Sequence, residues 1–306
     1  MAQKFDVHIL GCGSALPTHK HLPSCQVVNV RDKLFMLDCG EGAQLSWRHT
    51  GLGWSRLGHV FITHAHGDHV FGLPGLISSM ALMGRTAPLH IYAPSSLRPF
   101  VQCVLANFCV GMDYDVEFHA VDTMRHALIY DDRSIEVWSL PLQHRVPCCG
   151  YLLKEKQGLP HIRREMIDFY GIPTWAINGI KAGQDWQTPD GQTVPCSRLT
   201  TPADPVRSYA YCTDTMPTDA LPEMIRGVNL LYHEATYADA ECAMAKNYAH
   251  STASQAALVA QRAEAGQLML GHFSARYDDE SQLLHEAQSI FPNTILASER
   301  MCVAVR

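Results

Sequence analysis

The sequence has no excess of basic residues. It contains 24 Lys and Arg against 30 Asp and Glu, which gives a net charge of −6 when the histidines are neutral. A nucleic-acid partner would therefore have to be met by a local basic surface, because the chain as a whole does not attract phosphates.

Long apolar runs are also missing. No stretch approaches the roughly eighteen apolar residues of a membrane-spanning helix, and the start, MAQKFDVHILGCGS, lacks the apolar core of a signal peptide. We therefore expect a cytoplasmic protein with no membrane partner. Repeats and low-complexity tracts are absent as well.

The eleven cysteines show no Cys-x-x-Cys spacing, and their number is odd. Cys148 and Cys149 are adjacent and cannot easily form a normal disulfide with each other. Cysteines scattered in this way are most often small buried residues of a reducing compartment. We assign them no metal role.

The composition is that of a globular protein. With 306 residues, of which 47% are hydrophobic and 18% charged, the chain can bury a sizeable core in one large domain or two ordinary ones. We expect a single domain over 1–306.

Strand and helix patterns alternate over most of the chain. Strands are expected at 4–10, 25–30, 33–38, 59–64, 89–94, 134–142, 151–156, 208–215, 229–235 and 267–274. Helices are expected at 70–83 and at 251–265, where Ser251 and Thr252 can cap the first turn. Residues 158–205, rich in Gly, Pro and polar residues, interrupt this alternation and are interpreted as an inserted arm.

The stretch FITHAHGDHVFGLPG (61–75) concentrates four possible metal ligands within six positions. His64 and His66 project to the same side of an extended chain and can reach one ion. Asp68 and His69 follow Gly67, where the chain can turn, and can serve a second ion. This mixture of imidazoles and carboxylates is typical of zinc.

Two ions need more ligands than this loop supplies, and three later strand ends offer them. We expect the first ion to take His64, His66 and His144, and the second to take Asp68, His69 and His272. Asp214 can bridge both, because a carboxylate has two oxygens. A hydroxide between the ions would act as the nucleophile, since metal binding lowers the pKa of water.

The motif THAHGDHVFGLPGL resembles the His-x-His-x-Asp-His motif of the metallo-β-lactamase superfamily. The wider set resembles one family within it, tRNase Z (RNase Z) in its short form, and covers most of the chain. The motifs that carry this resemblance are ILGCGSALP (9–17), LDCGEGAQ (37–44), YCTDT (211–215), HEATY (233–237), HST (250–252) and HFSARY (272–277).

The resemblance implies an αβ/βα sandwich of the α+β class with two zinc ions per chain. It also implies a phosphodiesterase that cuts precursor tRNA next to the discriminator nucleotide, leaving a 3′-hydroxyl on the tRNA and a 5′-phosphate on the trailer. A homodimer is implied too, in which each arm grips the tRNA bound at the partner subunit.

Two residues are expected to move protons. The family motif assigns the general base to Asp68, and we expect His250 to protonate the leaving 3′-oxygen. Glu234 is available to offset the unfavourable position of a protonated His250 before a helix. Glu234 and His233 could equally be structural residues at the end of a strand.

Further candidates are less specific. Arg276 is expected to contact a substrate phosphate, with surface ion pairing as its alternative. Arg163, Arg164 and Lys181 of the arm can contact the tRNA backbone, with a solvated face of mixed charge as the equal alternative, because Glu165 and Asp168 lie nearby. Trp175 and Ala176 stand where family arms usually carry a glycine–proline run. His19 and His21 are expected in a solvated loop without metal partners.

Two other functions compete with this one. A general phosphodiesterase of the same fold would act on small esters or other RNA, and would have no need of an arm far from the metals. A zinc- or RNA-binding protein without catalytic activity would have no need of seven ligands together with His250.

Overall fold

The computed structural model describes residues 4–306, and the chain divides into two compact units. Residues 4–154 and 207–306 form the first unit, and Glu155–Val206 forms the second. The range expected for the inserted arm, 158–205, lies within the second unit. The first three residues of the expected domain lie outside the described residues.

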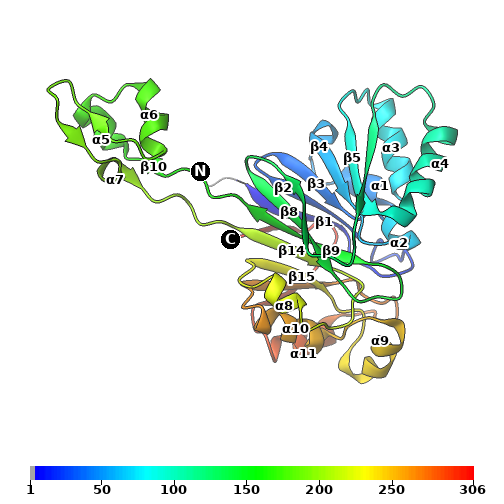
Figure 1. Ribbon diagram of the computed structural model, residues 1–306. Helices are drawn as coiled ribbons and strands as arrows, with labels where there is room; N and C mark the ends of the chain where they lie inside the picture. The colour runs from blue at the N-terminus through cyan, green and yellow to red at the C-terminus, as the bar shows by residue number, and fades with distance from the viewer. Residues whose placement is uncertain (1–3) are drawn as a thin grey trace. The chain divides into compact units, whose positions relative to one another are not determined.

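Two seven-stranded sheets build the first unit (Figure 1). The first sheet, called sheet A here, has the order β18-β1-β2-β3-β4-β5-β6. Its strands are β18 (Cys302–Ala304), β1 (Phe5–Gly11), β2 (Cys25–Val30), β3 (Lys33–Leu37), β4 (Leu57–Phe61), β5 (Leu89–Pro94) and β6 (Val116–Val121). Strands β3 to β6 are parallel, so their carboxyl ends meet at one edge.

The second sheet, sheet C, has the order β17-β16-β15-β14-β9-β8-β7. Its strands are β17 (Thr294–Leu296), β16 (Gln267–Gly271), β15 (Leu230–Glu234), β14 (Ser208–Cys212), β9 (Cys149–Glu155), β8 (Ile135–Pro141) and β7 (Ala127–Asp131). Strands β14 to β17 are parallel, whereas β9 pairs with β14 in the antiparallel direction.

Alternating side chains divide each strand between two apolar layers. In β3, Phe35 and Leu37 face the core between the sheets, while Leu34 and Met36 pack with the helices on the other side. Strand β5 repeats this division, with Tyr92 in the inner layer and Ile91 in the outer one. Both faces of sheet A are therefore buried, as parallel strands require.

Helices cover the outer faces of both sheets (Figure 1). On sheet A they are α1 (Ala43–Trp47), α3 (Leu73–Leu82) and α4 (Arg98–Phe108), with the single-turn α2 (Gly67–Val70) beside them. On sheet C they are α8 (Leu221–Met224), α10 (Ala253–Arg262) and α11 (Ser281–Gln288), and α9 (Cys242–Tyr248) follows β15. Short 3₁₀ turns lie at Trp54–Arg56, Ser95–Leu97 and Asp239–Glu241.

The second unit has its own small core. Its elements are β10 (His161–Ile162), α5 (Arg164–Tyr170), α6 (Thr174–Lys181), β11 (Trp186–Gln187), β12 (Thr193–Val194), α7 (Cys196–Leu199) and β13 (Thr200–Thr201). Ile172, Ile180 and Leu199 are buried within it. Trp175 is 79% exposed.

Several expected boundaries were wrong. The helix expected over 70–83 is two helices, because the Gly72 N–H donates to the Cys39 carbonyl oxygen and not within a helix, and α3 then begins with a proline in its first turn. Strand β4 ends at Phe61, so His64 lies in a loop rather than on the strand. The helix expected over 251–265 spans Ala253–Arg262, and Thr252 is confirmed as its cap: its hydroxyl accepts a hydrogen bond from the Gln255 N–H in a capping box.

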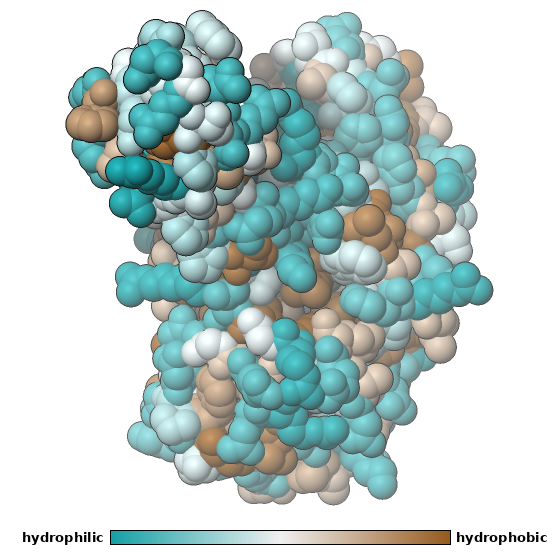
Figure 2. All heavy atoms as spheres, turned by 60° about the vertical axis from the view of Figure 1, so that its left-hand side comes forward, coloured by the Kyte–Doolittle hydropathy of each residue, from teal (hydrophilic) through white to brown (hydrophobic). Residues whose placement is uncertain are grey.

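Hydrophilic side chains predominate on the face shown in Figure 2, where apolar ones form small separate groups. Among residues 4–306, no helix combines the length and apolar character needed to cross a membrane.

Candidate active site

The loop after β4 carries four of the expected ligands. His64 and His66 lie between β4 and α2, and Asp68 and His69 lie in the first turn of α2. The loop after β3 packs tightly against this turn: a Cβ on Gly40 would approach the Asp68 carbonyl oxygen to 2.5 Å. This close backbone approach explains the glycine of LDCGEG.

The other three ligands follow strands of sheet C. His144 comes after β8, Asp214 after β14 and His272 after β16. Asp214 and His272 have φ angles of 51° and 58°, a left-handed conformation that is uncommon for residues other than glycine. Such conformations are held by their surroundings and cluster at functional sites.

The two oxygens of Asp214 face two different sets of histidines. Oδ1 lies 3.9 Å from His64 Nε2 and 3.8 Å from His144 Nε2. Oδ2 lies 3.2 Å from both His69 Nε2 and His272 Nε2. Asp214 is therefore placed to bridge two neighbouring cation positions.

Carbonyl and carboxylate acceptors orient two of the rings from behind. His69 Nδ1 lies 2.7 Å from Oδ2 of buried Asp38, and His144 Nδ1 lies 3.0 Å from the Ala249 carbonyl oxygen. Because these groups only accept hydrogen bonds, each Nδ1 carries the proton and each Nε2 presents its lone pair to the cluster. This arrangement is common behind metal-binding histidines.

Two threonine hydroxyls do the same for His64 and His272. Thr63 Oγ1 donates to Asp38 and lies 2.9 Å from His64 Nδ1. Thr236 Oγ1 donates to Glu234 Oε2 at 2.6 Å and lies 2.9 Å from His272 Nδ1. With its proton committed to a carboxylate, each hydroxyl accepts from the imidazole Nδ1–H, so that Nε2 carries the lone pair. The Nε2 atom of His272 has no hydrogen-bond partner within residues 4–306, whereas that of His64 lies 2.9 Å from His66 Nδ1.

The inward nitrogens fit a bound metal. His69, His144 and His272 each have a buried Nε2 atom with no hydrogen-bond geometry to any partner within residues 4–306, an arrangement that is costly unless a cation binds there. Burial lowers the pKa of His64 and His144, which favours the neutral imidazole that metals bind. The donor set thus fits two divalent cations, one on each side of Asp214.

Asp68 stays ionised in this setting. Burial opposes its charge, but His69 and His272 hold the pKa of the carboxyl well below its usual range. Its Oδ2 lies 3.3 Å from His69 Nε2 and accepts a hydrogen bond of 2.9 Å from the Ala15 N–H.

His250 faces Glu234. The Nδ1 of His250 lies 2.9 Å from Glu234 Oε1 and 4.0 Å from Asp214 Oδ1. Burial opposes a charged ring, but the Glu234 carboxylate raises the pKa of His250 to about 9. The charged, proton-donating form of His250 is therefore favoured by its partner.

Glu234 also joins three loops. It is fully buried and accepts hydrogen bonds from the backbone N–H groups of Thr215 and Ser251, at 2.6 Å and 3.1 Å. The YCTDT, HEATY and HST segments are thereby fixed to one carboxylate. His233 instead places its Nδ1 2.8 Å from the Glu234 carbonyl oxygen and is buried in the sheet.

A cavity of about 350 Å³ opens onto the ligands and His250. Its wall includes Arg145, whose guanidinium lies over the Tyr248 ring, and Tyr237. Arg276 is exposed, with its guanidinium 5.1 Å from the centre of the Tyr237 ring. These two arginines put positive charge at the cavity. Lys181 lies in the last turn of α6, in the second unit.

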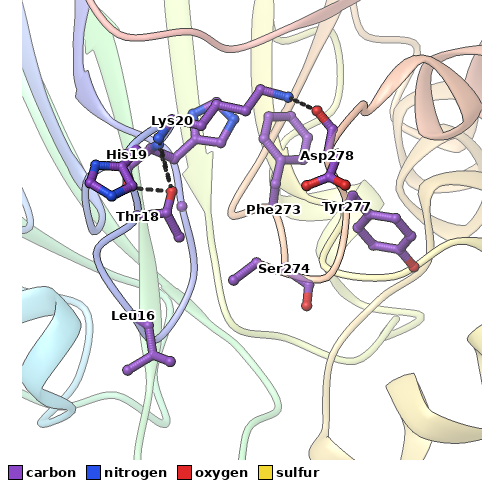
Figure 3. A pocket seen from close by; sticks show the side chains of 11 residues that line it. Leu16, Thr18, His19, Lys20, Phe273, Ser274, Tyr277 and Asp278 are labelled. Atoms are coloured by element: carbon purple, nitrogen blue, oxygen red, sulfur yellow. Dashed lines mark hydrogen bonds between the residues drawn. The ribbon is translucent and has the colours of Figure 1, made fainter.

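A second cavity, of about 250 Å³, shares Leu16, Ser274 and Ala275 with the first (Figure 3). Lys20 lines it and donates a hydrogen bond of 2.9 Å to the Asp278 carbonyl oxygen.

The expectation that His21 lies in a solvated loop was wrong. His21 is buried, and its two nitrogens face Glu299 at 2.9 Å and Glu280 at 3.2 Å, because the loop folds back onto the C-terminal part of the chain. His19 is exposed, as expected.

Comparison with known proteins decides the family. Ribonuclease Z of Bacteroides thetaiotaomicron is 54% identical over 303 residues, which cover 99% of this chain and 96% of that protein. Ribonuclease Z of Parabacteroides distasonis is 50% identical over 301 residues, with 98% and 99% covered. The chain belongs to the ribonuclease Z family.

Solved structures agree on the fold. The short form of human tRNase Z has a TM-score of 0.71 at 24% identity and covers 98% of this chain and 99% of its own. The metallo-β-lactamase fold protein YhfI of Bacillus subtilis has a TM-score of 0.68 at 17% identity, with 98% and 99% covered. A family model described as anti-Pycsar protein Apyc1 matches residues 5–138.

These comparisons confirm the expected family, fold class and hydrolytic endoribonuclease class. The residues that orient the ligands were not anticipated: Asp38, Thr63 and Thr236 lie behind the histidines. Arg145 in the cavity wall was not anticipated either. Only Asp38 had a visible signal, as an acidic residue that directly follows an apolar strand. Nothing in the spacing of a single threonine distinguishes a ligand support from any other strand-end residue.

Proposed function

We propose that this member of the ribonuclease Z family removes the 3′ trailer of precursor tRNA by hydrolysis at the cavity between the ends of sheets A and C. The observation that carries the proposal is the arrangement of six other ligands around the two oxygens of Asp214. His250 lies beside them with a carboxylate behind it.

Two zinc ions per chain would be held by this set. His64, His66 and His144 would hold the first, and Asp68, His69 and His272 the second, with Asp214 serving both. When bound, such a pair supplies Lewis acidity, which activates water and neutralises charge on a reacting phosphate.

The protein's own groups would position and move protons. Asp68, ionised and held by the Ala15 N–H, accepts the proton of the attacking water or orients it. His250 uses Nδ1 to contact Glu234, which leaves Nε2 to protonate the departing 3′-oxygen of the tRNA. The products are a tRNA with a 3′-hydroxyl and a trailer with a 5′-phosphate.

Residues outside the ligand set would bind the tRNA substrate. Arg276 would meet a phosphate at the cavity, and Lys181 would meet the tRNA backbone from the second unit, which acts as an exosite in a cytoplasmic homodimer. A chain with a negative net charge can bind tRNA in this way, because these residues place positive charge locally where the tRNA would lie.

The deciding experiment is cleavage of a precursor tRNA with a 3′ trailer, with the products mapped at nucleotide resolution. The zinc-loaded protein should cut directly 3′ of the discriminator nucleotide, and chelation should abolish cutting. If the precursor stays intact while a small phosphodiester is hydrolysed, the tRNA assignment fails and the general phosphodiesterase replaces it.

A further inference from the structure

A second group of histidines lies on sheet A, at the end opposite the catalytic ligands. The catalytic loop follows the carboxyl end of β4, whereas this group sits at the amino ends of β5 and β6. Strand register brings its members to one face: His59 pairs with His90, and His90 pairs with Glu117. His119 lies two residues beyond Glu117 on the same face.

Three donor atoms of this group converge. His90 Nδ1 lies 3.2 Å from His119 Nε2 and 3.3 Å from Glu117 Oε2, and the last two atoms are 3.8 Å apart. Ligands held at about 2.0–2.2 Å around tetrahedral zinc are separated from one another by roughly 3.3–3.6 Å. The three atoms therefore form one face of a coordination tetrahedron with little movement.

Hydrogen bonding alone explains this convergence poorly. His90 Nδ1 faces both His119 Nε2 and Glu117 Oε2, but a single N–H can donate a well-directed hydrogen bond to only one of them.

Stacked rings hold the group in place. The His59 ring stacks on His90 with centroids 5.0 Å apart, and the Tyr92 ring stacks on His119 at 4.5 Å. The side chains of His90, Glu117 and His119 are 25%, 51% and 38% exposed, so an ion and a water molecule can reach them from solvent.

We propose that His90, Glu117 and His119 bind a third divalent transition-metal ion of the zinc class. Two imidazoles with one carboxylate favour zinc, copper or nickel over magnesium and calcium. The fourth coordination position is open to solvent. Because β6 is the edge strand of sheet A within the described residues, the ion would tie this edge to β5.

The test is equilibrium dialysis of the full chain against buffered free zinc, with bound zinc counted by mass spectrometry. The wild type should bind three ions per chain at high free zinc, and His119→Gln and His90→Gln should each bind one fewer. His285→Gln, which removes an exposed histidine of α11 outside any such group, should match the wild type.

Equal zinc counts in the wild type and in both cluster variants would overturn the proposal. Circular dichroism and thermal unfolding of the zinc-free proteins guard against misfolding. The result does not depend on the proposed function: a protein that fails to cut precursor tRNA would still lose one ion in His119→Gln. Cleavage by that variant should equal cleavage by the wild type.

Discussion

Glu234 Oε1 lies 2.9 Å from His250 Nδ1, at the point where three loops meet the cluster of candidate metal ligands. The same carboxylate accepts hydrogen bonds from two backbone N–H groups and from Thr236 Oγ1. One buried charge thus sets both the protonation of His250 and the shape of the cavity around it.

Glu234→Gln should therefore lose both activity and stability. Its amide keeps one accepting oxygen but turns donors toward backbone N–H groups, which should cost about 1–3 kcal/mol in the free energy of unfolding. Cleavage of precursor tRNA should fall about 10²-fold or more, as expected when a general acid is displaced. Urea unfolding and single-turnover cleavage measure the two effects. Glu223→Gln, an exposed change, should leave both unaltered.

Removing single ligands should separate the two cation positions. These measurements use a free zinc concentration too low to fill the proposed site at His90, Glu117 and His119. Asp68→Asn should then retain about one ion per chain, whereas Asp214→Asn should bind both ions weakly. Cleavage should fall more than about 100-fold in both variants. Replacing a residue that only hydrogen-bonds to a metal ligand typically lowers activity or metal affinity about 10–100-fold, and replacing the ligand itself should cost more. Asp219→Asn, at an exposed residue, is the matched control. Retention of both ions by Asp214→Asn would contradict the bridging position.

The buried pair of His21 and Glu299 should make stability depend on pH. Burial opposes the charge of His21, but Glu299 and Glu280 raise its pKa above 6.5. The contribution of His21 to the free energy of unfolding is therefore complete below pH 6.5 and is lost as the pH rises through the raised pKa. Burial raises the pKa of Glu299 and His21 lowers it, with a net shift below 4.5, so that contribution is lost only in acid.

The stabilisation of the wild type over His21→Gln should thus be greatest between about pH 4.5 and 6.5. Urea unfolding from pH 5 to 9 measures it. The matched change at exposed His49 is the control for the substitution itself. A His21 contribution that grows toward alkaline pH would refute this account.

The second unit should be removable without harm to the cluster of candidate metal ligands. Lys154 of β9 and Ser208 of β14 are directly paired, so the chain leaves and re-enters the sandwich at neighbouring positions. Replacing residues 155–207 with an Asn-Gly turn would make β9 and β14 a simple hairpin. This variant should hydrolyse a small phosphodiester at close to the normal rate but bind and cut precursor tRNA at least about tenfold less well. Unchanged cleavage of tRNA would remove the proposed role of the arm.

The sequence was most informative where ligands crowd together. Four candidates in six residues can be recognised without a structure, and apolar runs ending in His144, Asp214 and His272 point to one edge of a sheet. The structure brings all seven together. The sequence left two roles open for Glu234, as the partner of His250 or as a structural residue. A glutamate at a strand end has no sequence pattern that distinguishes a catalytic role from a structural one.

Contacts between distant segments were beyond sequence reasoning. His21 is buried only because residues near 280 and 299 return to it, and no local pattern in THKHLPS reports that return. Thr63 and Thr236 act through hydrogen bonds whose partners are fixed by sheet packing. Short helices such as α2 fall below the length at which apolar periodicity can be read.

Tyr211 of β14 donates a hydrogen bond of 3.0 Å to Asp38, which follows β3 in the other sheet and supports His69. The ligands are divided in the same way: four come from the sheet A side, and three from the sheet C side. Cations bound here would therefore cross-link the two sheets. The same ions that bind the substrate's phosphate would then also hold the two sheets in their relative position.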